Sequence, residues 1–185
     1  MSPHRSRRRD AWYRVVTRLL AFSLAPVAVL VTADRARHTA CQWALALRFP
    51  AERLHGLTPA ARAAFEAART RALWWHGELL GLTSGYRDPA AQAVMFAAAV
   101  ARTGSTEAAR RWALPPHESR HVAGEALDVR PMEGARWLAE HGSVYGLYRP
   151  YDNEWWHFEY YADRGPTPGL RPGNALTART PGSPA

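Results

Sequence analysis

The sequence predicts one small domain in which about three helices accompany short strands. At 185 residues the chain is long enough for a single domain with a real core, and too short for two domains of ordinary size. Three segments read as helices, two of them with clear start signals, and three others read as short extended pieces bounded by turns. These two sets of segments alternate along the chain, which indicates a mixed class of helices and strands.

The first predicted helix starts at Thr58, a residue type that caps helix N-termini, with Pro59 at the first helical position. Apolar residues then follow at spacings of three and four: Phe65, Ala68, Ala72 and Trp75. Residues at this spacing share one side of a helix, so we expect that side to be buried.

Two further helices have clear signals at their ends. The second has Asp88 as its cap and Pro89 at its first position, and it stops at Gly104. The segment 105–118 follows and reads as a loop because it contains two adjacent prolines. The third helix is expected over roughly 133–140.

Short strands are expected around these helices. The stretch "LTSGYRDP" reads as a brief extended piece and a turn, and "GEALDVRP" as a short strand that ends at Pro131. The stretch "EWWHFEYY" is rich in aromatic residues and is the best strand candidate in the chain.

The net charge of +8 does not indicate a nucleic-acid partner once its distribution is considered. The first 40 residues hold eight arginines and two aspartates, whereas the remainder holds sixteen arginines and fourteen acidic residues. The segment expected to fold is therefore nearly neutral, and we expect no nucleic-acid binding.

The basic N-terminal segment predicts export from the cytoplasm. Six arginines precede an apolar run over 19–31, which is the pattern of a secretory signal. A transmembrane helix needs about 20 apolar residues, so the run alone is short for a span. We expect cleavage after Ala33; the alternative is an uncleaved membrane anchor with Arg14 and Arg18 at the cytoplasmic face. Either way, the domain is expected to work outside the cytoplasm.

The chain therefore divides into three predicted parts. Residues 1–40 are a signal peptide or membrane anchor, 41–163 form the folded domain, and 164–185 are a disordered tail rich in proline and glycine. Cys41 is the only cysteine, so no intramolecular disulfide is possible, and we expect a packed or exposed thiol.

Three residues near the two later strands have the chemistry of metal ligands: His121, Asp128 and His157. Two imidazoles and one carboxylate, with a fourth position left to water, make a common catalytic zinc arrangement. Glu154 would be free to act as a base. The alternative is that the histidines are ordinary buried residues and the aspartate belongs to a turn or a salt bridge.

The spacing of these residues restricts how they can meet. Residues seven or three apart fall on opposite faces of an ideal strand. His121 must therefore come from the loop before the strand that carries Asp128, with Gly124 allowing the chain to bend. Likewise, Glu154 is expected at a turn just before the strand that carries His157.

Three motifs in this order resemble those of a known family. "SRHVAGEALDV" fits the pattern SxHxxGxAxD, "EWWHF" fits ExxHF, and "SGYRD" is followed by Gln92. The chain is similar over roughly 57–161 to the zinc D-alanyl-D-alanine carboxypeptidases of the VanY type, within the lysostaphin, D-Ala-D-Ala and hedgehog-like metallopeptidases. The resemblance implies an α+β domain whose small antiparallel sheet carries the zinc site and is packed by about three helices.

The resemblance also implies roles for individual residues. The metal ligands are matched by the histidines and aspartate named above, the catalytic base by Glu154, and an arginine that faces the scissile carbonyl by Arg87. Arg87 could instead bind the substrate's terminal carboxylate, or form a surface salt bridge with Asp88. The resemblance matches Ser119 and Gln92 to positions near the substrate or supporting the site. Apart from the resemblance, Tyr86 and Tyr151 are also expected to contact the substrate, Tyr151 because it lies on the approach to Glu154. By contrast, His117 and Glu118 have no family counterpart and are expected to be solvated.

The function implied by the resemblance is removal of the terminal D-alanine from cell-wall stem peptides, with Zn²⁺ as cofactor. Two alternatives are an endopeptidase that cuts L-alanyl-D-glutamate bonds and a cell-wall binding module that has lost catalysis. Peptidoglycan stem peptides are the expected partners, together with a membrane tether if the N-terminal segment is retained.

Overall fold

A four-stranded antiparallel sheet lies at the centre of the computed structural model, which describes residues 3–151 and 154–163. Its strand order is β1-β2-β4-β3. The strands are β1 (Gly81–Ser84), β2 (Ala126–Arg130), β3 (Leu147–Tyr148) and β4 (His157–Tyr160). The predicted α+β class is thus confirmed, whereas the predicted disordered tail lies outside the described residues.

The first predicted helix is α3 (Pro59–Arg71), and the Thr58 side chain caps it by accepting a hydrogen bond from the Ala61 N–H at 3.2 Å. The prediction that Trp75 lies on its buried face is wrong, because Trp75 is 57% exposed. Residues 72–76 continue the helix as a π-helical turn. Such a turn is wider than an α-helical one, so residues within it, including Trp75, leave the three-and-four spacing.

The second predicted helix is α4 (Pro89–Thr103), which is capped by Asp88 and ends at Gly104 with φ +78°. The segment that follows is not only a loop, as predicted. Ser105 caps the short helix α5 (Thr106–Ala109), and a 3₁₀ turn covers Pro116–Glu118. The capping serine and the helix-favouring alanines after it explain this difference.

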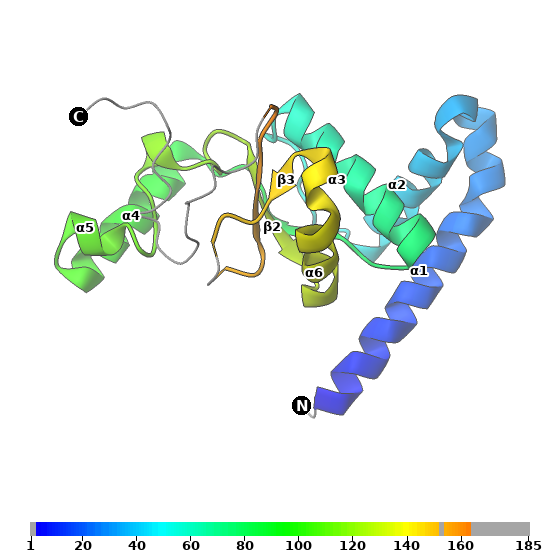
Figure 1. Cartoon of the computed structure of the whole chain (residues 1–185), viewed down its shortest axis with the longest axis horizontal. Coiled ribbons are helices and arrows are strands. Elements are labelled where there is room, and N and C mark those ends of the chain that lie inside the picture. The colour runs from blue at the N-terminus through cyan, green and yellow to red at the C-terminus, as the bar shows by residue number, and fades with distance from the viewer. Residues whose placement is uncertain (1–2, 152–153, 164–185) are drawn as a thin grey trace.

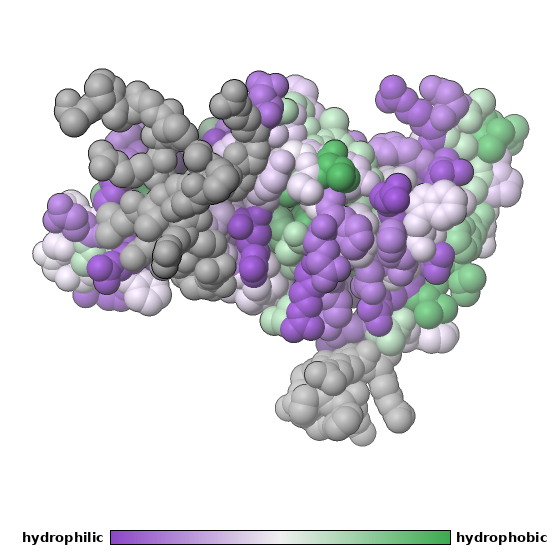
Figure 2. Space-filling model, viewed as in Figure 1, coloured by the Kyte–Doolittle hydropathy of each residue, from purple (hydrophilic) through white to green (hydrophobic). Residues whose placement is uncertain are grey.

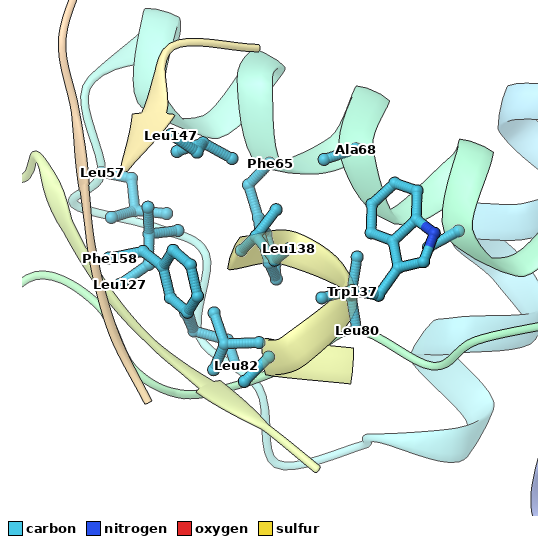
Figure 3. Close-up of a cluster of buried hydrophobic side chains, with 13 residues drawn as sticks. Leu57, Phe65, Ala68, Leu80, Leu82, Leu127, Trp137, Leu138, Leu147 and Phe158 are labelled. Atoms are coloured by element: carbon cyan, nitrogen blue, oxygen red, sulfur yellow. The ribbon is translucent and has the colours of Figure 1, made fainter. Parts of the chain in front are cut away.

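The third predicted helix is α6 (Met132–His141), and it packs with α3 on one face of the sheet (Figure 1). Alternation along each strand turns Leu127 and Phe158, which pair across β2 and β4, toward these helices. Figure 3 shows these side chains converging with residues from the helices, including Phe65 and Leu138, which are fully buried. The neighbouring strand positions therefore face the opposite side of the sheet.

Two N-terminal helices, α1 (Pro3–Val31) and α2 (Ala36–Arg48), lie at the end of the molecule opposite α4 and α5 (Figure 1). They form a second core against the π-helical turn and the chain before β1. The predicted boundary between residues 40 and 41 falls inside α2, where Cys41 is buried. Burial raises the pKa of this thiol to about 12, as expected for a packed residue.

In the described part of the chain, the stretch Arg9–Val31 of α1 is long and apolar enough to cross a membrane, by length and composition alone. A signal sequence or a buried core helix would have the same properties. This candidate span is longer than the apolar run over 19–31 because it also includes residues 9–18, among them Arg14 and Arg18.

A buried ion pair connects α3 to the edge of the sheet. Arg69 Nη1 donates to Glu52 Oε2 at 2.8 Å, and both side chains are almost completely buried. The other carboxylate oxygen, Oε1, accepts a hydrogen bond from the backbone N–H of Leu82 in β1 at 2.6 Å. Glu52 thereby fixes the strand that leads into the Arg87 segment.

We predict that Glu52→Ala lowers the free energy of unfolding by about 3–5 kcal/mol, because it leaves the Arg69 guanidinium buried without its partner. Urea denaturation followed by circular dichroism would measure the change. The matched control is Glu140→Ala, an exposed glutamate on α6, which should change stability by less than about 0.5 kcal/mol. Equal stability of the two variants would contradict the role given to the pair.

Candidate metal centre

Three side chains able to bind a metal converge beside the sheet: His121, Asp128 and His157. One ligand atom from each lies within 4.8 Å of the others. Asp128 Oδ1 is 3.1 Å from His157 Nδ1 and 3.4 Å from His121 Nε2. Both histidines are buried, so the arrangement is held by the fold and is not a chance cluster on the surface.

The sheet and one tight turn bring these residues together. Asp128 on β2 pairs directly with His157, the first residue of β4, and both point to the face away from the hydrophobic core. His121 comes from the turn before β2, as the spacing predicts. That turn bends at Gly124, whose φ is +73°. A Cβ there would lie 2.4 Å from the carbonyl oxygen of Gly56, so only glycine fits.

Each histidine is oriented by a hydrogen bond to its second ring nitrogen. His121 Nδ1 lies 2.6 Å from the carbonyl oxygen of Gly85, which can only accept, so Nδ1 carries the hydrogen and Nε2 is the free ligand atom. In His157 the two ring nitrogens have the opposite roles: Nε2 lies 3.1 Å from Glu159 Oε1, and Nδ1 is directed at Asp128. Fixed ring nitrogens of this kind are usual behind metal-binding histidines. The residues therefore fit a bound metal ion.

Glu159 is a functional candidate that sequence reasoning missed. It is buried, and its Oε2 accepts a hydrogen bond from the Tyr161 hydroxyl at 2.5 Å and lies 3.3 Å from Arg120 Nε. Burial would raise the pKa of this carboxyl, but its hydrogen bond with His157 and the other two partners hold it below the usual value. The signal available in the sequence was its position two residues after His157, on the same face of the strand.

The charges in the centre are strongly coupled. Burial alone would raise the pKa of Asp128, but the neighbouring imidazoles of His121 and His157 hold it well below its usual range. Burial would lower the pKa of His157, yet hydrogen bonds to Asp128 and Glu159 raise it to about 9. Metal binding would therefore be coupled to loss of a proton from His157.

Glu154 lies just before the turn that leads into β4, where the spacing places it. Its backbone carbonyl accepts a hydrogen bond from the His157 N–H at 3.2 Å, and its Oε2 lies 4.0 Å from His157 Nδ1. Burial is the main reason that the pKa of this carboxyl is raised. Glu154 is thus a partly buried carboxylate beside the metal ligands, without being one of the three.

Arg87 is held at the edge of the same site by Gln92. Its Nη1 donates to Gln92 Oε1 at 2.7 Å, and Nη2 lies 4.0 Å from Asp128 Oδ2. The buried Gln92 amide in turn donates to the carbonyl oxygen of Leu114 at 2.7 Å. The alternative of a surface salt bridge with Asp88 is not found among the ion pairs of the described residues, where Arg87 pairs with Asp128 and the Asp88 side chain caps α4.

A cavity of about 280 Å³ opens onto the metal ligands, Glu154 and Arg87. Of the four positions expected near the substrate, Ser119, Gln92 and Tyr151 line it. Tyr86 does not, because its ring lies against Gly56 instead. Three further residues of the wall were not expected from the sequence: Met95, Trp112 and Arg120.

His117 and Glu118 lie outside the cavity lining, as expected from the sequence. The His117 side chain is mostly exposed, and the Glu118 carboxylate pairs with Arg110. Although they are adjacent to the metal-binding motif in the sequence, these two residues are not part of the site.

Comparison with solved structures gives several matches. The LdcB LD-carboxypeptidase is 27% identical with a TM-score of 0.47, over 58% of this chain and 66% of its own. A mutant of the vancomycin resistance D,D-pentapeptidase VanY in complex with Zn(II) is 28% identical, with a TM-score of 0.44 over 56% and 70%. VanYB in complex with D-alanine-D-alanine is 26% identical, with a TM-score of 0.45 over 56% and 68%. The chain thus spans about two thirds of the length of these structures.

No curated protein matches the sequence. The family model of VanY, described as D-alanyl-D-alanine carboxypeptidase, matches residues 55–163. This range is more than half of the chain and contains the three candidate metal ligands, Glu154, Arg87 and Glu159. The chain therefore belongs to the VanY family of D-alanyl-D-alanine carboxypeptidases.

Proposed function

We propose that this protein is a zinc-dependent carboxypeptidase that hydrolyses the last peptide bond of peptidoglycan stem peptides and releases D-alanine. The observation that supports this most is the presence of Glu154 and Arg87 beside the three metal ligands, in a single cavity. Membership of the VanY family supports the reaction and the substrate class.

The donor set supports zinc as the metal. His121 would bind through Nε2 and His157 through Nδ1, because their other nitrogens make hydrogen bonds, and Asp128 would supply a carboxylate oxygen. Three protein ligands of these types are usual for catalytic zinc. When bound, zinc supplies a Lewis acid that makes attack of water on a peptide carbonyl feasible near neutral pH.

Glu154 is placed to take the proton from the attacking water and to return it to the leaving amine. Its carboxylate lies near His157 Nδ1, the nitrogen directed at the metal position. Burial raises its pKa, which makes it a stronger base than an exposed glutamate. The turn before β4 keeps Glu154 beside the proposed metal position, although Glu154 is not one of the three proposed ligands.

Two roles are compatible with the position of Arg87. Its guanidinium is oriented by Gln92 and Ser84, and it points a second nitrogen toward the Asp128 side of the site. A planar cation in this position could stabilise the negative charge that develops on the scissile carbonyl oxygen. It could equally bind the terminal carboxylate of the substrate by a bidentate contact.

The proposed place of action is outside the cytoplasm, where peptidoglycan is exposed. The basic N-terminal segment followed by an apolar helix supports export.

The proposed reaction predicts a defined product. The full chain with added zinc, incubated with a stem pentapeptide, should release one D-alanine, detected as a single mass loss. A stem tetrapeptide incubated in parallel distinguishes an L,D-carboxypeptidase, which would shorten the tetrapeptide instead. Internal cleavage would show an endopeptidase, and binding without cleavage would show a wall-binding module; either result would overturn the proposal.

We further predict that Glu154→Gln lowers kcat by about 100- to 10,000-fold, because the amide cannot accept the proton. Zinc content, measured by elemental analysis of the purified variant, should be unchanged. Glu140→Gln on the exposed face of α6 is the control and should keep full activity. If the Glu154 variant turned over substrate as fast as the wild type, the assignment of Glu154 as the base would be wrong.

Glu159→Gln should weaken zinc binding by about 10- to 100-fold, because it removes the negative charge behind His157 Nε2. Competition with a chromogenic chelator measures zinc affinity directly, without relying on activity. Glu133→Gln, an exposed glutamate at the start of α6, is the matched control. An unchanged affinity in the Glu159 variant would mean that this carboxylate serves folding alone.

A further inference from the structure

A groove of about 360 Å³, which we call the tyrosine groove, lies at the β3 edge of the sheet. It is formed by the 3₁₀ turn Gly142–Tyr145, by β3 and by the end of β4 with the residues after it. Four tyrosines line it, and each is partly exposed: Tyr145, Tyr148, Tyr160 and Tyr161. In Figure 2, strongly hydrophobic residues gather along the α1 edge of the molecule, whereas residues of intermediate hydropathy predominate beside β3. The tyrosine groove shares no lining residue with the cavity at the metal ligands.

Two of these tyrosines connect the groove to that cavity. Tyr148 pairs with Glu159 across β3 and β4, so both side chains point to the face of the sheet that carries the metal ligands. The Tyr161 hydroxyl donates to Glu159 Oε2 at 2.5 Å, and its ring lies edge-on to that of Tyr148, with ring centres 5.9 Å apart. Glu159 itself lines the cavity. The tyrosine groove therefore begins directly beside the catalytic cavity.

The strand order places the groove and Arg87 on opposite sides of the metal ligands. Arg87 follows β1 at one edge of the sheet, Asp128 and His157 lie on the two inner strands, and the groove lies beside β3 at the other edge. A substrate whose C-terminal end lies on the Arg87 side would therefore extend its N-terminal part toward the groove. In a peptidoglycan stem, the N-terminal end of the peptide is attached to the glycan strand.

The lengths involved suit this attachment. Neighbouring strands lie about 4.8 Å apart, so the outer edge of β3 is roughly 5–10 Å from β4. The four residues that precede the last peptide bond of a pentapeptide stem span at most about 14 Å when fully extended. A stem peptide that reaches the metal ligands would thus bring its glycan strand next to the groove.

The lining of the groove suits a neutral sugar. A tyrosine presents a flat apolar ring and a hydroxyl that can both donate and accept hydrogen bonds. A hexose has matching features, with C–H groups on its ring faces and hydroxyl groups around its rim. Among the described residues, the lining includes the carboxylate of Asp163 and no arginine or histidine. A phosphate or another anion would find no cationic partner there, whereas N-acetylated hexoses are neutral.

We propose that the tyrosine groove binds the glycan strand of peptidoglycan, through the N-acetylated hexose units nearest to the stem peptide in the catalytic cavity. The inference rests on the proposed function, because it extends the same substrate beyond its peptide. The groove contributes affinity for the polymeric substrate and takes no part in the hydrolysis itself.

The test measures glycan binding separately from catalysis. The probe is glycan strands of peptidoglycan, freed of stem peptides by an amidase and immobilised on beads, and the full chain should bind them. Tyr148→Ala should lower this binding by about tenfold, because it removes a flat ring from the groove. Tyr148→Phe keeps the ring and should retain more affinity than Tyr148→Ala. Trp75→Ala, which alters an exposed aromatic residue outside the groove and the cavity, is the matched control and should bind like the wild type.

Turnover distinguishes a glycan contact from a structural role. Tyr148→Ala should slow release of D-alanine from intact peptidoglycan by about tenfold more than release from a free stem pentapeptide, because only the polymer carries the glycan. A variant with a damaged fold or metal site would be slowed equally on both substrates.

Three results would overturn the proposal. The wild type would fail to bind the bare glycan strands, or Tyr148→Ala would bind them as the wild type does. Equal loss of turnover on both substrates would mean that Tyr148 supports the metal centre through Glu159. Failure of the proposed function alone would look different: the bare glycan strands would still bind, while no D-alanine would be released from the free pentapeptide.

Discussion

The antiparallel pairing of β2 with β4 places Asp128 directly opposite His157, and the candidate metal centre depends on this register. Side chains alternate along a strand, so a slip of one residue would turn one ligand into the hydrophobic core. The same alternation buries Leu127 and Phe158 against the helices on the other face. The packing of the core and the geometry of the site are therefore fixed by a single set of backbone hydrogen bonds.

The carboxylates of Asp128 and Glu159 on the site face are largely buried, and each is matched to hydrogen-bond donors. Glu159 illustrates this, since it interacts with His157, Tyr161 and Arg120 at once. Removing a carboxylate from water is costly unless such partners replace the solvent. The result is a rigid support behind one metal ligand, comparable to the backbone carbonyl of Gly85 behind the other histidine.

The convergence of His121, Asp128 and His157 beside Glu154 could be predicted, because residue type and strand alternation together restrict where these side chains lie. Glu159 was missed because a carboxylate that follows a histidine by two residues is common in exposed strands and carries no sequence motif. Tyr86 was placed wrongly because adjacent residues in a turn can point in opposite directions, and only Arg87 points into the cavity. Trp75 was placed wrongly because residues 72–76 form a π-helical turn. Tertiary packing, and not the local sequence pattern, determines where such a turn forms.

The close approach of Gly124 to Gly56 joins the His121 turn to the chain just before α3. The Thr58 N–H donates to the Gly124 carbonyl at 2.9 Å, which ties the two segments together although they are far apart in sequence. Such a junction has no room for an inserted residue or an added side chain. Insertions and deletions among related chains should therefore occur in segments such as 105–115, at the rim of the cavity. They should be absent next to residues 56 and 124.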